Sequence, residues 1–330
     1  MSNNLLSVSL IISCRNEEKF ISKCLDSLIK QDYPKEKMEI LVVDGISEDK
    51  TREIIKEYSK KFSFIKLFEN PKKYTPFGLN IGINKAKDDI IIRVDAHAEY
   101  EKDYISKCTK YLKEYNADNV GGVIKTVPSN NSSVAKAIAI CLSHFFGAGG
   151  SYFRTGSKKP IEVDTVFGGC YKREVFDKIG LFNEKLIRSQ DIELNRRLKA
   201  SGGKILLVPD ITAYYYPQNN LVDFFEHNFV DGIWTIYPLK FGIRIFSLRH
   251  LIPLFFTLSL FLSIILFPFF PIAILFFDFI FGIYILLSLF FSVKISIKNG
   301  FKYFFLMPIV FLSRHVGYGL GSIWGLIKLI

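Results

Sequence analysis

Two potential metal ligands stand at the end of an apolar run. Residues 90–94, Ile-Ile-Ile-Arg-Val, are rich in β-branched side chains and are expected to form a buried strand, and Asp95-Ala96-His97 follows directly. Because side chains alternate between the two faces of an extended chain, Asp95 and His97 are expected to project to the same side. A carboxylate and an imidazole at the carboxyl end of a strand could bind a divalent cation. The alternative is a solvated turn after a core strand.

A further acid, Asp191, belongs to a second polar motif. The segment Ser189-Gln190-Asp191-Ile192-Glu193 precedes a helical pattern with Leu194 and Leu198 on its apolar face, and Ser189 or Asp191 is expected to cap this helix. A carboxylate here could act as a general base that accepts a proton from a hydroxyl nucleophile. The alternative is that Asp191 and Glu193 are favourable acids in the first turn of a helix and nothing more.

The elements that must position these residues follow an alternating pattern. Strands are expected at residues 8–13, 40–43, 65–68 and 90–94, and apolar periodicity predicts helices between them. Asn16 is expected to cap the first helix, with Glu17 in its first turn. This order predicts an α/β fold with a largely parallel sheet covered by helices on both faces. Polar residues 14–16, Asp44 and Asp95 then follow three strand ends that should converge on one crevice.

Composition divides the chain into a soluble part and a membrane part. The protein has 330 residues, of which 49% are hydrophobic, and most of the apolar excess lies near the carboxyl end. We expect a catalytic domain at 1–217, an amphipathic interfacial segment at 218–249 and a helical transmembrane region at 250–330. Residues 251–267 and 272–293 each predict a membrane span, joined by a tight turn at Pro268 and Pro271.

The third apolar segment, residues 303–329, contains Arg314 and His315. It is expected either to span the membrane or to form a re-entrant hairpin. The two polar side chains could meet a phosphate of a lipid-linked acceptor, or they could reach to the membrane interface. Gly317, Gly319, Gly321 and Gly325 would allow close helix packing with either topology.

Charge and cysteine content indicate a compartment. No basic segment followed by a long apolar run precedes Arg15, so we expect no cleaved signal peptide and a catalytic domain on the cytoplasmic side of the cell membrane. The five cysteines are far apart and lack a CxxC pair, so buried thiols are favoured over disulfides or zinc. The net charge of +11 comes from scattered Lys and Arg without a basic stripe, which favours anionic lipid headgroups over nucleic acid as partners.

Three motifs, taken in order, resemble a known family. Val42-Val43-Asp44-Gly45-Ile46-Ser47-Glu48-Asp49-Lys50-Thr51, then Gly78-Leu79-Asn80-Ile81-Gly82, then Asp95-Ala96-His97 resemble the nucleotide-binding half of family 2 glycosyltransferases with the GT-A fold. The forms VDGxSxDxT and VDAHA are similar to the membrane-anchored subgroup of succinoglycan and exopolysaccharide biosynthesis. The resemblance covers residues 7–217. It implies a multi-pass membrane glycosyltransferase that uses a nucleoside diphosphate sugar.

The resemblance also implies roles for individual residues on the donor side. Asp44 would contact the nucleoside, Asp95 the ribose or metal, and His97 the metal, which would be Mn²⁺ or Mg²⁺. Further donor contacts would come from Asn16, Glu17 and Asn80. The chain departs from the family in two places: His97 replaces the second acid of Asp-x-Asp, which suits Mn²⁺ better than Mg²⁺, and Leu79 stands where a basic residue is common.

On the acceptor side, Asp191 would be the general base of an inverting displacement, and Gln190 replaces the acid that usually precedes it. Acceptor contacts are expected from Gly168, Gly169, Gln190 and Glu193. Gly168 and Gly169 also indicate a place where backbone approaches another group closely. Residues 128–160 are expected to form a mobile lid or acceptor loop, or alternatively a loosely packed surface insertion.

The best interpretation is therefore transfer of a sugar to a lipid-linked saccharide acceptor during cell-surface polysaccharide synthesis. One alternative transfers the sugar directly to polyprenyl phosphate, as dolichol-phosphate-mannose-type synthases do. A processive synthase is disfavoured because no Gln-x-x-Arg-Trp motif follows the catalytic helix. The non-enzymatic alternative is a membrane-anchored nucleotide-binding protein.

Overall fold

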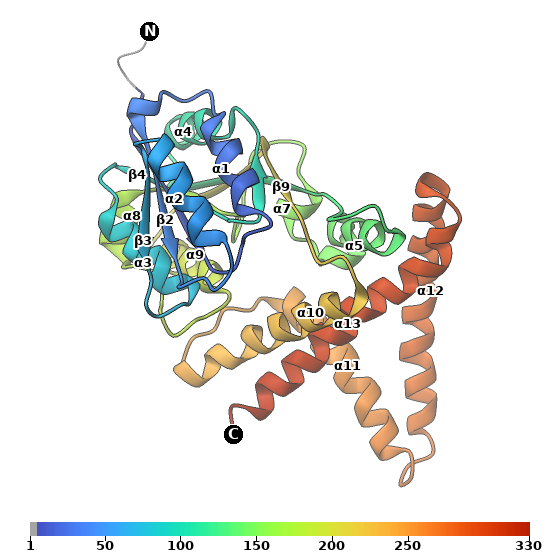
Figure 1. Cartoon of the computed structure of the whole chain (residues 1–330). Coiled ribbons are helices and arrows are strands. Elements are labelled where there is room, and N and C mark those ends of the chain that lie inside the picture. The colour runs from blue at the N-terminus through green and yellow to red at the C-terminus, as the bar shows by residue number, and fades with distance from the viewer. Residues whose placement is uncertain (1–4) are drawn as a thin grey trace. The chain divides into compact units, whose positions relative to one another are not determined.

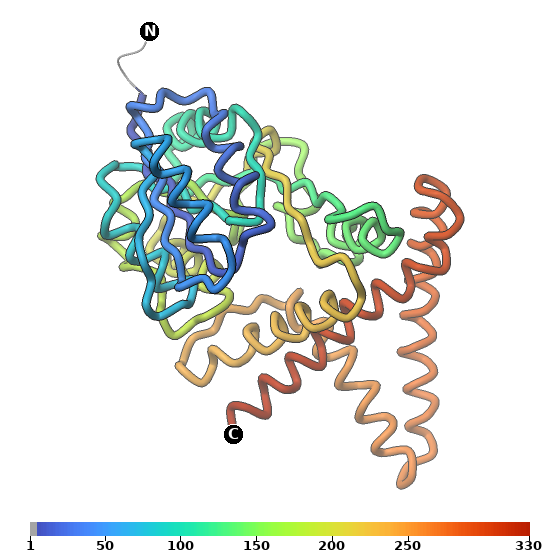
Figure 2. Tube along the Cα trace, in the orientation of Figure 1, coloured from blue at the N-terminus to red at the C-terminus, as the bar shows by residue number. Residues whose placement is uncertain are grey.

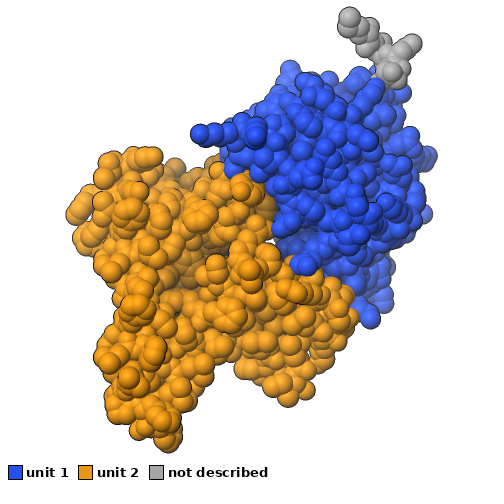
Figure 3. All heavy atoms as spheres, turned by 180° about the vertical axis from the view of Figure 1, so that it is seen from behind, with its two compact units in different colours: residues 1–125, 156–215 blue, residues 126–155, 216–330 orange. Residues whose placement is uncertain are grey.

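The computed structural model describes residues 5–330, which divide into two compact units (Figure 3). Unit 1 contains the described residues up to Lys125 together with Gly156–Tyr215, and unit 2 contains Thr126–Thr155 and Tyr216–Ile330. The first four residues of the segment considered for a signal peptide lie outside the described part of the chain. Residues 126–155, expected in the catalytic domain, thus group with the carboxyl-terminal helices instead.

One half of the sheet in unit 1 is parallel, as the alternating pattern predicts. Strands β1 (Val8–Cys14), β2 (Met38–Asp44), β3 (Ile65–Glu69) and β4 (Ile90–Val94) lie in the order β3-β2-β1-β4 with parallel pairing throughout. β1 and β2 are apolar at most positions and almost wholly buried. This half is the core that fixes the strand ends.

The other half of the sheet differs from the prediction of a largely parallel sheet. Three of its strands are very short: β5 (Ala98–Tyr100), β7 (Ile161–Glu162) and β8 (Cys170–Lys172). Two longer strands, β6 (Asn119–Thr126) and β9 (Ile205–Tyr215), complete an order of β4-β8-β6-β9-β5, with β7 beside β9. The pairs β4–β8, β6–β8, β5–β9 and β7–β9 are antiparallel. Two- and three-residue strands carry too little pattern to be recognised from sequence.

Helices connect and cover the strands of unit 1 (Figure 1). They are α1 (Ile21–Ile29), α2 (Thr51–Lys61), α3 (Thr75–Lys85), α4 (Tyr104–Glu114), α8 (Arg173–Ile179) and α9 (Gln190–Ala200). Because parallel crossovers are right-handed, the strand order places α1 and α2 on one face and α3 on the other. The prediction that Asn16 caps α1 is wrong, since the helix begins at Ile21 and Asn16 lies in the preceding loop with a φ of 57°.

All five cysteines are buried and free, which confirms the expectation of reduced thiols. At α9, Ser189 occupies the position before the helix but adopts a φ of 60° and makes no side-chain cap hydrogen bond. The expected cap interaction is therefore not formed. The start of α9 depends on other contacts, described below.

Unit 2 is helical. Three short helices, α5 (Ser133–Ser143), α6 (Phe145–Ala148) and α7 (Tyr152–Thr155), come from the 126–155 segment. The others are α10 (Leu221–Ile236), the 3₁₀ helix η2 (Tyr237–Phe241), α11 (Leu248–Leu266), α12 (Ala273–Asn299) and α13 (Lys302–Ile327). Helices α11, α12 and α13 are long and apolar enough to cross a membrane, and α11 and α12 form a hairpin (Figure 2).

The 126–155 segment packs in unit 2 because α5 is an apolar helix. Ala137, Ile138, Cys141 and Leu142 lie in one buried cluster with residues of α10, α12 and α13. The other buried members of this cluster are Phe224, Ile295, Tyr303, Met307, Val310 and Phe311. The segment is therefore not a loosely packed insertion.

Arg314 and His315 lie within α13, which is one continuous helix and not a hairpin. Arg314 donates hydrogen bonds from Nε to the carbonyl of Gly147 and from NH1 to Asn228 Oδ1. His315 Nε2 lies 3.0 Å from the carbonyl oxygen of Phe146. Both polar side chains thus attach α6 of the 126–155 segment to α13. Neither contact requires an external phosphate.

Close packing of α10 against α13 depends on glycine. Side chains added at glycines of α13 would meet backbone carbonyls of α10, in the pairs Gly317 with Phe225, Gly321 with Phe229, and Gly325 with Ile233. The glycines of α13 and their partners in α10 are each spaced four residues apart. The residue numbers increase in the same direction along both helices, so the two helices run parallel. At Gly321 an added Cβ would overlap the carbonyl group of Phe229. Unit 2 therefore uses the small-residue packing that is common between helices in membranes.

We expect Gly321→Ala to lower the stability of the solubilised protein by about 1–3 kcal/mol, because the added methyl group must force α10 and α13 apart. The matched control is Gly282→Ala in α12, where an added Cβ meets nothing within 4 Å. Thermal unfolding in one detergent compares the two variants. Equal unfolding temperatures for both would contradict the close contact.

Candidate functional site

The ends of three parallel strands meet at one edge of the sheet. In the parallel register Cys14 pairs with Asp44, and Ile12 pairs with Val94. The loops that follow β1, β2 and β4 therefore start side by side. This places Asn16 and Glu17, Asp44, and Asp95 with His97 around the same edge, as the pattern predicts.

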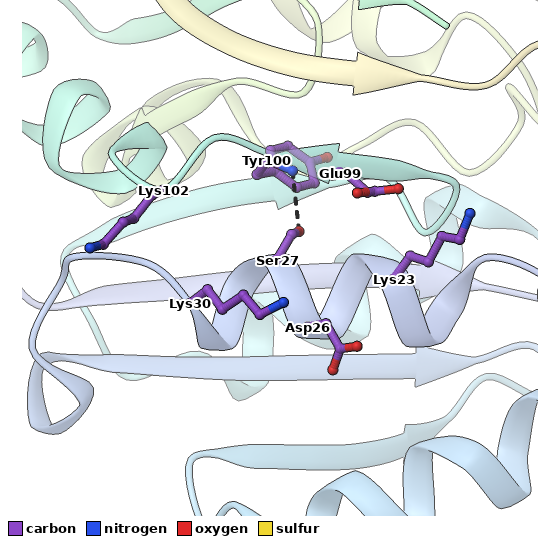
Figure 4. Close-up of a pocket in the computed structure, with 7 residues that line it drawn as sticks. All are labelled: Lys23, Asp26, Ser27, Lys30, Glu99, Tyr100 and Lys102. Atoms are coloured by element: carbon purple, nitrogen blue, oxygen red, sulfur yellow. Dashed lines mark hydrogen bonds between the residues drawn. The ribbon is translucent and has the colours of Figure 1, made fainter. Parts of the chain in front are cut away.

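The loop after β4 is held by contacts with α1 and β5. Asp95 N–H donates to the Tyr100 hydroxyl at 2.8 Å, and Cys24 Sγ lies 3.5 Å from the Asp95 carbonyl oxygen. Tyr100 N–H donates in turn to Ser27 Oγ at 3.1 Å, which ties β5 to α1 (Figure 4). Asp95 and His97 thus lie in the short loop between β4 and β5, and hydrogen bonds hold both ends of this loop.

A row of alternating charges crosses the site. His97 Nδ1 lies 3.3 Å from Glu17 Oε1 and 4.0 Å from Asp95 Oδ1. On the other side of Asp95, Arg93 NH2 lies 4.0 Å from Asp95 Oδ2, and Arg93 NH1 lies 3.2 Å from Asp191 Oδ2. The order is acid, imidazole, acid, guanidinium, acid. Asp191, far away in sequence, is thereby brought to the carboxyl end of β4.

These neighbours change the protonation of the basic groups. Burial lowers the pKa of His97, but the carboxylates of Asp95 and Glu17 outweigh burial and raise it to about 9. Burial also lowers the pKa of Arg93, but Asp191 and Asp95 outweigh it and the net direction is upward. In the free protein both groups are therefore cationic near neutral pH. A metal ion at His97 would have to replace its proton.

Asp95 and His97 are the candidate metal ligands of the site. Asp95 Oδ1 lies 4.0 Å from His97 Nδ1, and these two groups would hold a divalent cation once the imidazole has lost its proton. Across residues 5–330, no group of three or more His, Cys, Asp or Glu side chains could hold a metal ion. Two protein ligands leave most positions of an octahedral cation for oxygens of a bound ligand.

Asp191 is held in place by the interior of α9. One turn further along, Asn195 is fully buried and hydrogen-bonds with three side chains of the core. Asn119 Nδ2 and the Tyr171 hydroxyl donate to Asn195 Oδ1 at 2.9 and 3.2 Å, and Asn195 Nδ2 donates to Thr165 Oγ1 at 2.9 Å. This network fixes the helix against the sheet. The Asp191 side chain, 30% exposed, remains accessible at the first turn.

Asp44 lies at the expected edge, but its side chain is fully buried. Its carboxylate accepts hydrogen bonds from the N–H and the hydroxyl of Ser47, and Arg52 NH1 lies 3.7 Å away. Asn16 is linked to the same loop, with its N–H donating to Ser47 Oγ at 2.9 Å. In this conformation Asp44 shapes the loop that a nucleoside would contact, and its direct contact with a nucleoside stays a prediction.

Asn80 is also committed to contacts within the protein. Its Nδ2 donates to the Phe182 carbonyl at 2.9 Å and to Glu184 Oε1 at 3.0 Å, and its Oδ1 accepts from Phe182 N–H at 3.0 Å. Asn80 thereby holds the loop that leads to α9. The neighbouring Leu79 is buried, so no side chain at that position reaches the site.

The residues expected to contact the acceptor divide into two groups. Gly168 and Gly169 have φ values of 68° and 103°, and Gly169 accepts a hydrogen bond from Arg93 N–H at 2.9 Å. The close approach that the two glycines predict is therefore to strand β4. Gln190 is buried, and the Glu193 carboxylate forms two hydrogen bonds with Arg197 at 2.7 and 2.8 Å. Direct acceptor contacts of these four residues stay predictions.

Arg93 is the functional residue that the sequence pattern did not assign. It belongs to the β-branched run of residues 90–94, whose pattern predicts a strand and nothing more. A signal was present, because a single charged residue two positions before Asp95 projects from the same face of the strand. The sequence pattern does not show that Asp191 contacts Arg93, because this contact depends on the folded structure.

Two cavities of the protein lie away from these acids. One of about 520 Å³ is lined by α1 and β5, with Lys23, Asp26 and Lys30 on the side of α1 and Glu99 and Lys102 on the side of β5 (Figure 4). Another of about 510 Å³ lies near the start of β4, with Asp89, Lys172 and Arg173 among its lining residues. Neither contains Asp95, His97 or Asp191. The candidate site is defined by its convergent charged groups.

A family model and two curated relatives all match this chain as a glycosyltransferase or a polysaccharide biosynthesis protein. The model of the family described as Glycosyl transferase family 2 matches residues 9–180. The chain is 32% identical over 330 residues to a dolichyl N-acetyl-α-D-glucosaminyl phosphate 3-β-D-2,3-diacetamido-2,3-dideoxy-β-D-glucuronosyltransferase of Methanococcus voltae, with 97% of each chain covered. It is 29% identical over 235 residues to the succinoglycan biosynthesis protein ExoA of Rhizobium meliloti, with 70% of each covered.

Solved structures share the fold. Residues 1–349 of Staphylococcus aureus TarS in complex with UDP-GlcNAc superpose with a TM-score of 0.51 and 20% identity, covering 70% of this chain and 67% of that one. GalNAc-T7 with UDP, GalNAc and Mn²⁺ gives a TM-score of 0.51 and 18% identity, covering 65% of this chain and 44% of that one. At these identities the likeness concerns the fold alone.

Proposed function

Since the chain belongs to glycosyl transferase family 2, we propose that it transfers a sugar from a nucleoside diphosphate sugar to a lipid-linked saccharide, with inversion at the anomeric carbon. That the chain is a glycosyltransferase follows from the family and from its relatives; donor, acceptor and stereochemistry are the proposal. The observation that carries it is the position of Asp191, whose carboxylate lies 3.2 Å from Arg93 on the strand that leads to Asp95.

Asp191 is the general base in this proposal. It accepts the proton of an acceptor hydroxyl while that oxygen attacks the anomeric carbon. The bond between this carbon and the diphosphate oxygen breaks, and the leaving diphosphate keeps the electron pair. Attack from the face opposite the leaving group inverts the configuration. One carboxylate is sufficient, because the diphosphate departs without needing a proton from an acid.

The donor occupies the other end of the charge row. Asp95 and His97 would hold a divalent cation, Mn²⁺ or Mg²⁺, that when bound stabilises charge on the leaving diphosphate. Glu17 Oε1 lies 3.3 Å from His97 Nδ1, the nitrogen that also faces Asp95, so Glu17 pairs with the protonated imidazole when no cation is bound. Asp44 and Asn16 shape the adjoining loop for the nucleoside. TarS, which shares the fold, has been solved in complex with UDP-GlcNAc. Nucleoside diphosphate sugars are therefore the class of donor to test with this protein.

Membrane attachment and a relative support the choice of acceptor. The Methanococcus voltae enzyme, which matches along nearly the whole chain, is named for a dolichyl phosphate-linked sugar as its acceptor. Three helices of this chain are apolar and long enough to span a bilayer. We therefore assign the protein to the cell membrane as a multi-pass enzyme. Lys240, Arg244 and Arg249 before α11, and Lys294 and Lys298 at the end of α12, favour a cytoplasmic catalytic unit.

Direct transfer to polyprenyl phosphate is the competing activity. Its product carries one sugar on a monophosphate, whereas the proposed product carries an extended saccharide. Lipid extraction after incubation with a labelled nucleotide-sugar distinguishes them by mass.

We expect Asp191→Asn to reduce transfer by about 100-fold or more while nucleotide-sugar binding is retained, because the amide keeps the shape but cannot accept the proton. Turnover with membranes that carry lipid-linked acceptors, and thermal stabilisation by a panel of nucleotide-sugars, measure the two properties. The matched control is Asp177→Asn on the exposed surface of α8, which should leave both unchanged. Normal turnover of Asp191→Asn would remove Asp191 from its role.

We expect His97→Asp to shift the metal preference from Mn²⁺ towards Mg²⁺, because an oxygen ligand replaces a nitrogen ligand. The ratio of initial rates with Mn²⁺ and with Mg²⁺ after removal of metal by EDTA measures the shift. The wild type should lose activity in EDTA and recover best with Mn²⁺. Transfer that is insensitive to EDTA would exclude Asp95 and His97 as metal ligands.

A further inference from the structure

We propose that Arg93 is the positioning residue of the catalytic base, and that it holds Asp191 in place while balancing the negative charge of Asp95. The inference rests on the proposed function, since it gives Asp191 the role of base. It extends that function by naming the group that connects the donor end of the site to the acceptor end. No motif of the chain assigns this role to Arg93.

The first support is the geometry of the guanidinium group. One amino group, NH1, lies 3.2 Å from Asp191 Oδ2, and the other, NH2, lies 4.0 Å from Asp95 Oδ2. The planar guanidinium group can contact two carboxylates through two amino groups whose relative positions are fixed. The ammonium group of Lys has a single nitrogen and no such fixed pair. The Arg93 side chain is 13% exposed, against 30% for Asp191, so the cation lies deeper than the base that it contacts.

The second support is the way the backbone of Arg93 is fixed. Strand β4 pairs with β1 on one side and with β8 on the other, and Arg93 itself pairs with Ile11 of β1. Arg93 N–H donates to the Gly169 carbonyl at 2.9 Å. A Cβ at Gly168 would stand 2.9 Å from the Arg93 carbonyl oxygen, so only glycine allows this approach. The backbone position from which the Arg93 side chain extends is therefore fixed by the sheet.

The third support is the local charge balance. Without Arg93, the carboxylates of Asp95 and Asp191 would share one site with no cation between them, and like charges in a partly buried site repel. A neutral replacement would favour movement of Asp191, on the first turn of α9, away from β4. Arg93 therefore allows an acid that serves the donor and an acid that serves the acceptor to lie in the same small site.

The orientation of the carboxylate is completed by α9 itself. Asp191 Oδ1 accepts a hydrogen bond from Ile192 N–H at 2.9 Å, and Oδ2 faces Arg93. Each oxygen thus has a fixed partner and keeps a further lone pair for the acceptor hydroxyl. Displacement of such a group by about 1 Å can cost about 100-fold in rate.

The test uses the full-length protein in detergent or native membranes with the nucleotide-sugar that gives turnover. We expect Arg93→Met to lower kcat by about 100-fold with a donor KM within about threefold of the wild type, because the base moves while the nucleotide contacts remain. Arg93→Lys should recover part of the lost kcat. Free guanidinium should raise the kcat of Arg93→Ala, since it can occupy the vacated space between the two acids.

Arg173→Ala is the matched control. Arg173 also lies in unit 1, at the opposite end of β4, where its Nε donates to the Asp88 carbonyl at 2.7 Å. Its loss should lower the unfolding temperature without a selective loss of kcat and without any response to guanidinium. Thermal unfolding of every variant separates loss of fold from loss of positioning.

The outcomes separate this inference from the proposed function. Full activity of Arg93→Met, or a loss of kcat in folded Arg93→Ala that guanidinium does not restore, would overturn the positioning role. So would a loss expressed mainly as a higher donor KM, which would make Arg93 a donor contact. If the wild type transfers no sugar from any nucleotide-sugar, the proposed function fails, and this is seen before any variant is compared.

Discussion

The ion pair between Arg93 and Asp191 is the interaction on which the site depends. Arg93 belongs to β4, the last strand of the parallel half of the sheet, and Asp191 belongs to α9, which lies between β8 and β9 of the antiparallel half in the sequence. Their 3.2 Å contact joins residues that are 98 positions apart and sets the acid beside the strand end that carries Asp95. Because partly buried charges are stable only when they are paired, the guanidinium and the acids on either side of it require one another. The mixed sheet thus serves to bring complementary charges to one edge.

The second unit obeys a different constraint. Its packing relies on glycines that let α10 and α13 touch along their backbones. The helical segment 126–155 interrupts the sequence of unit 1 and is built into unit 2, where Arg314 and His315 bind the backbone of its helix α6. The chain that forms the catalytic sheet therefore also contributes to the apolar helical unit. The proposed lipid-linked acceptor would require a catalytic domain and membrane helices in the same protein, and this chain contains both.

Sequence patterns predicted the parallel half of the fold and the helices well, because strands 90–94 and 40–43 and the apolar spans carry strong periodicity. They predicted a largely parallel sheet, and this was wrong for the second half, where strands of two or three residues have no readable period. They brought Asp95 and His97 together through the spacing of two residues. They could not show that Asp44 is buried or that Arg93 contacts Asp191, because both facts depend on contacts between distant segments. The cap expected at Asn16 failed for the same reason: its bonds go to the loop at Ser47.

The central claim is a single displacement at the anomeric carbon with one carboxylate as base. The anomeric configuration of the product tests it most directly. Nuclear magnetic resonance of the purified lipid-linked product, compared with the donor that was consumed, reports this configuration through the coupling of the anomeric proton. The account predicts complete inversion. A product that retains the configuration of the donor would require two displacements or a front-face reaction, and it would contradict the role given to Asp191.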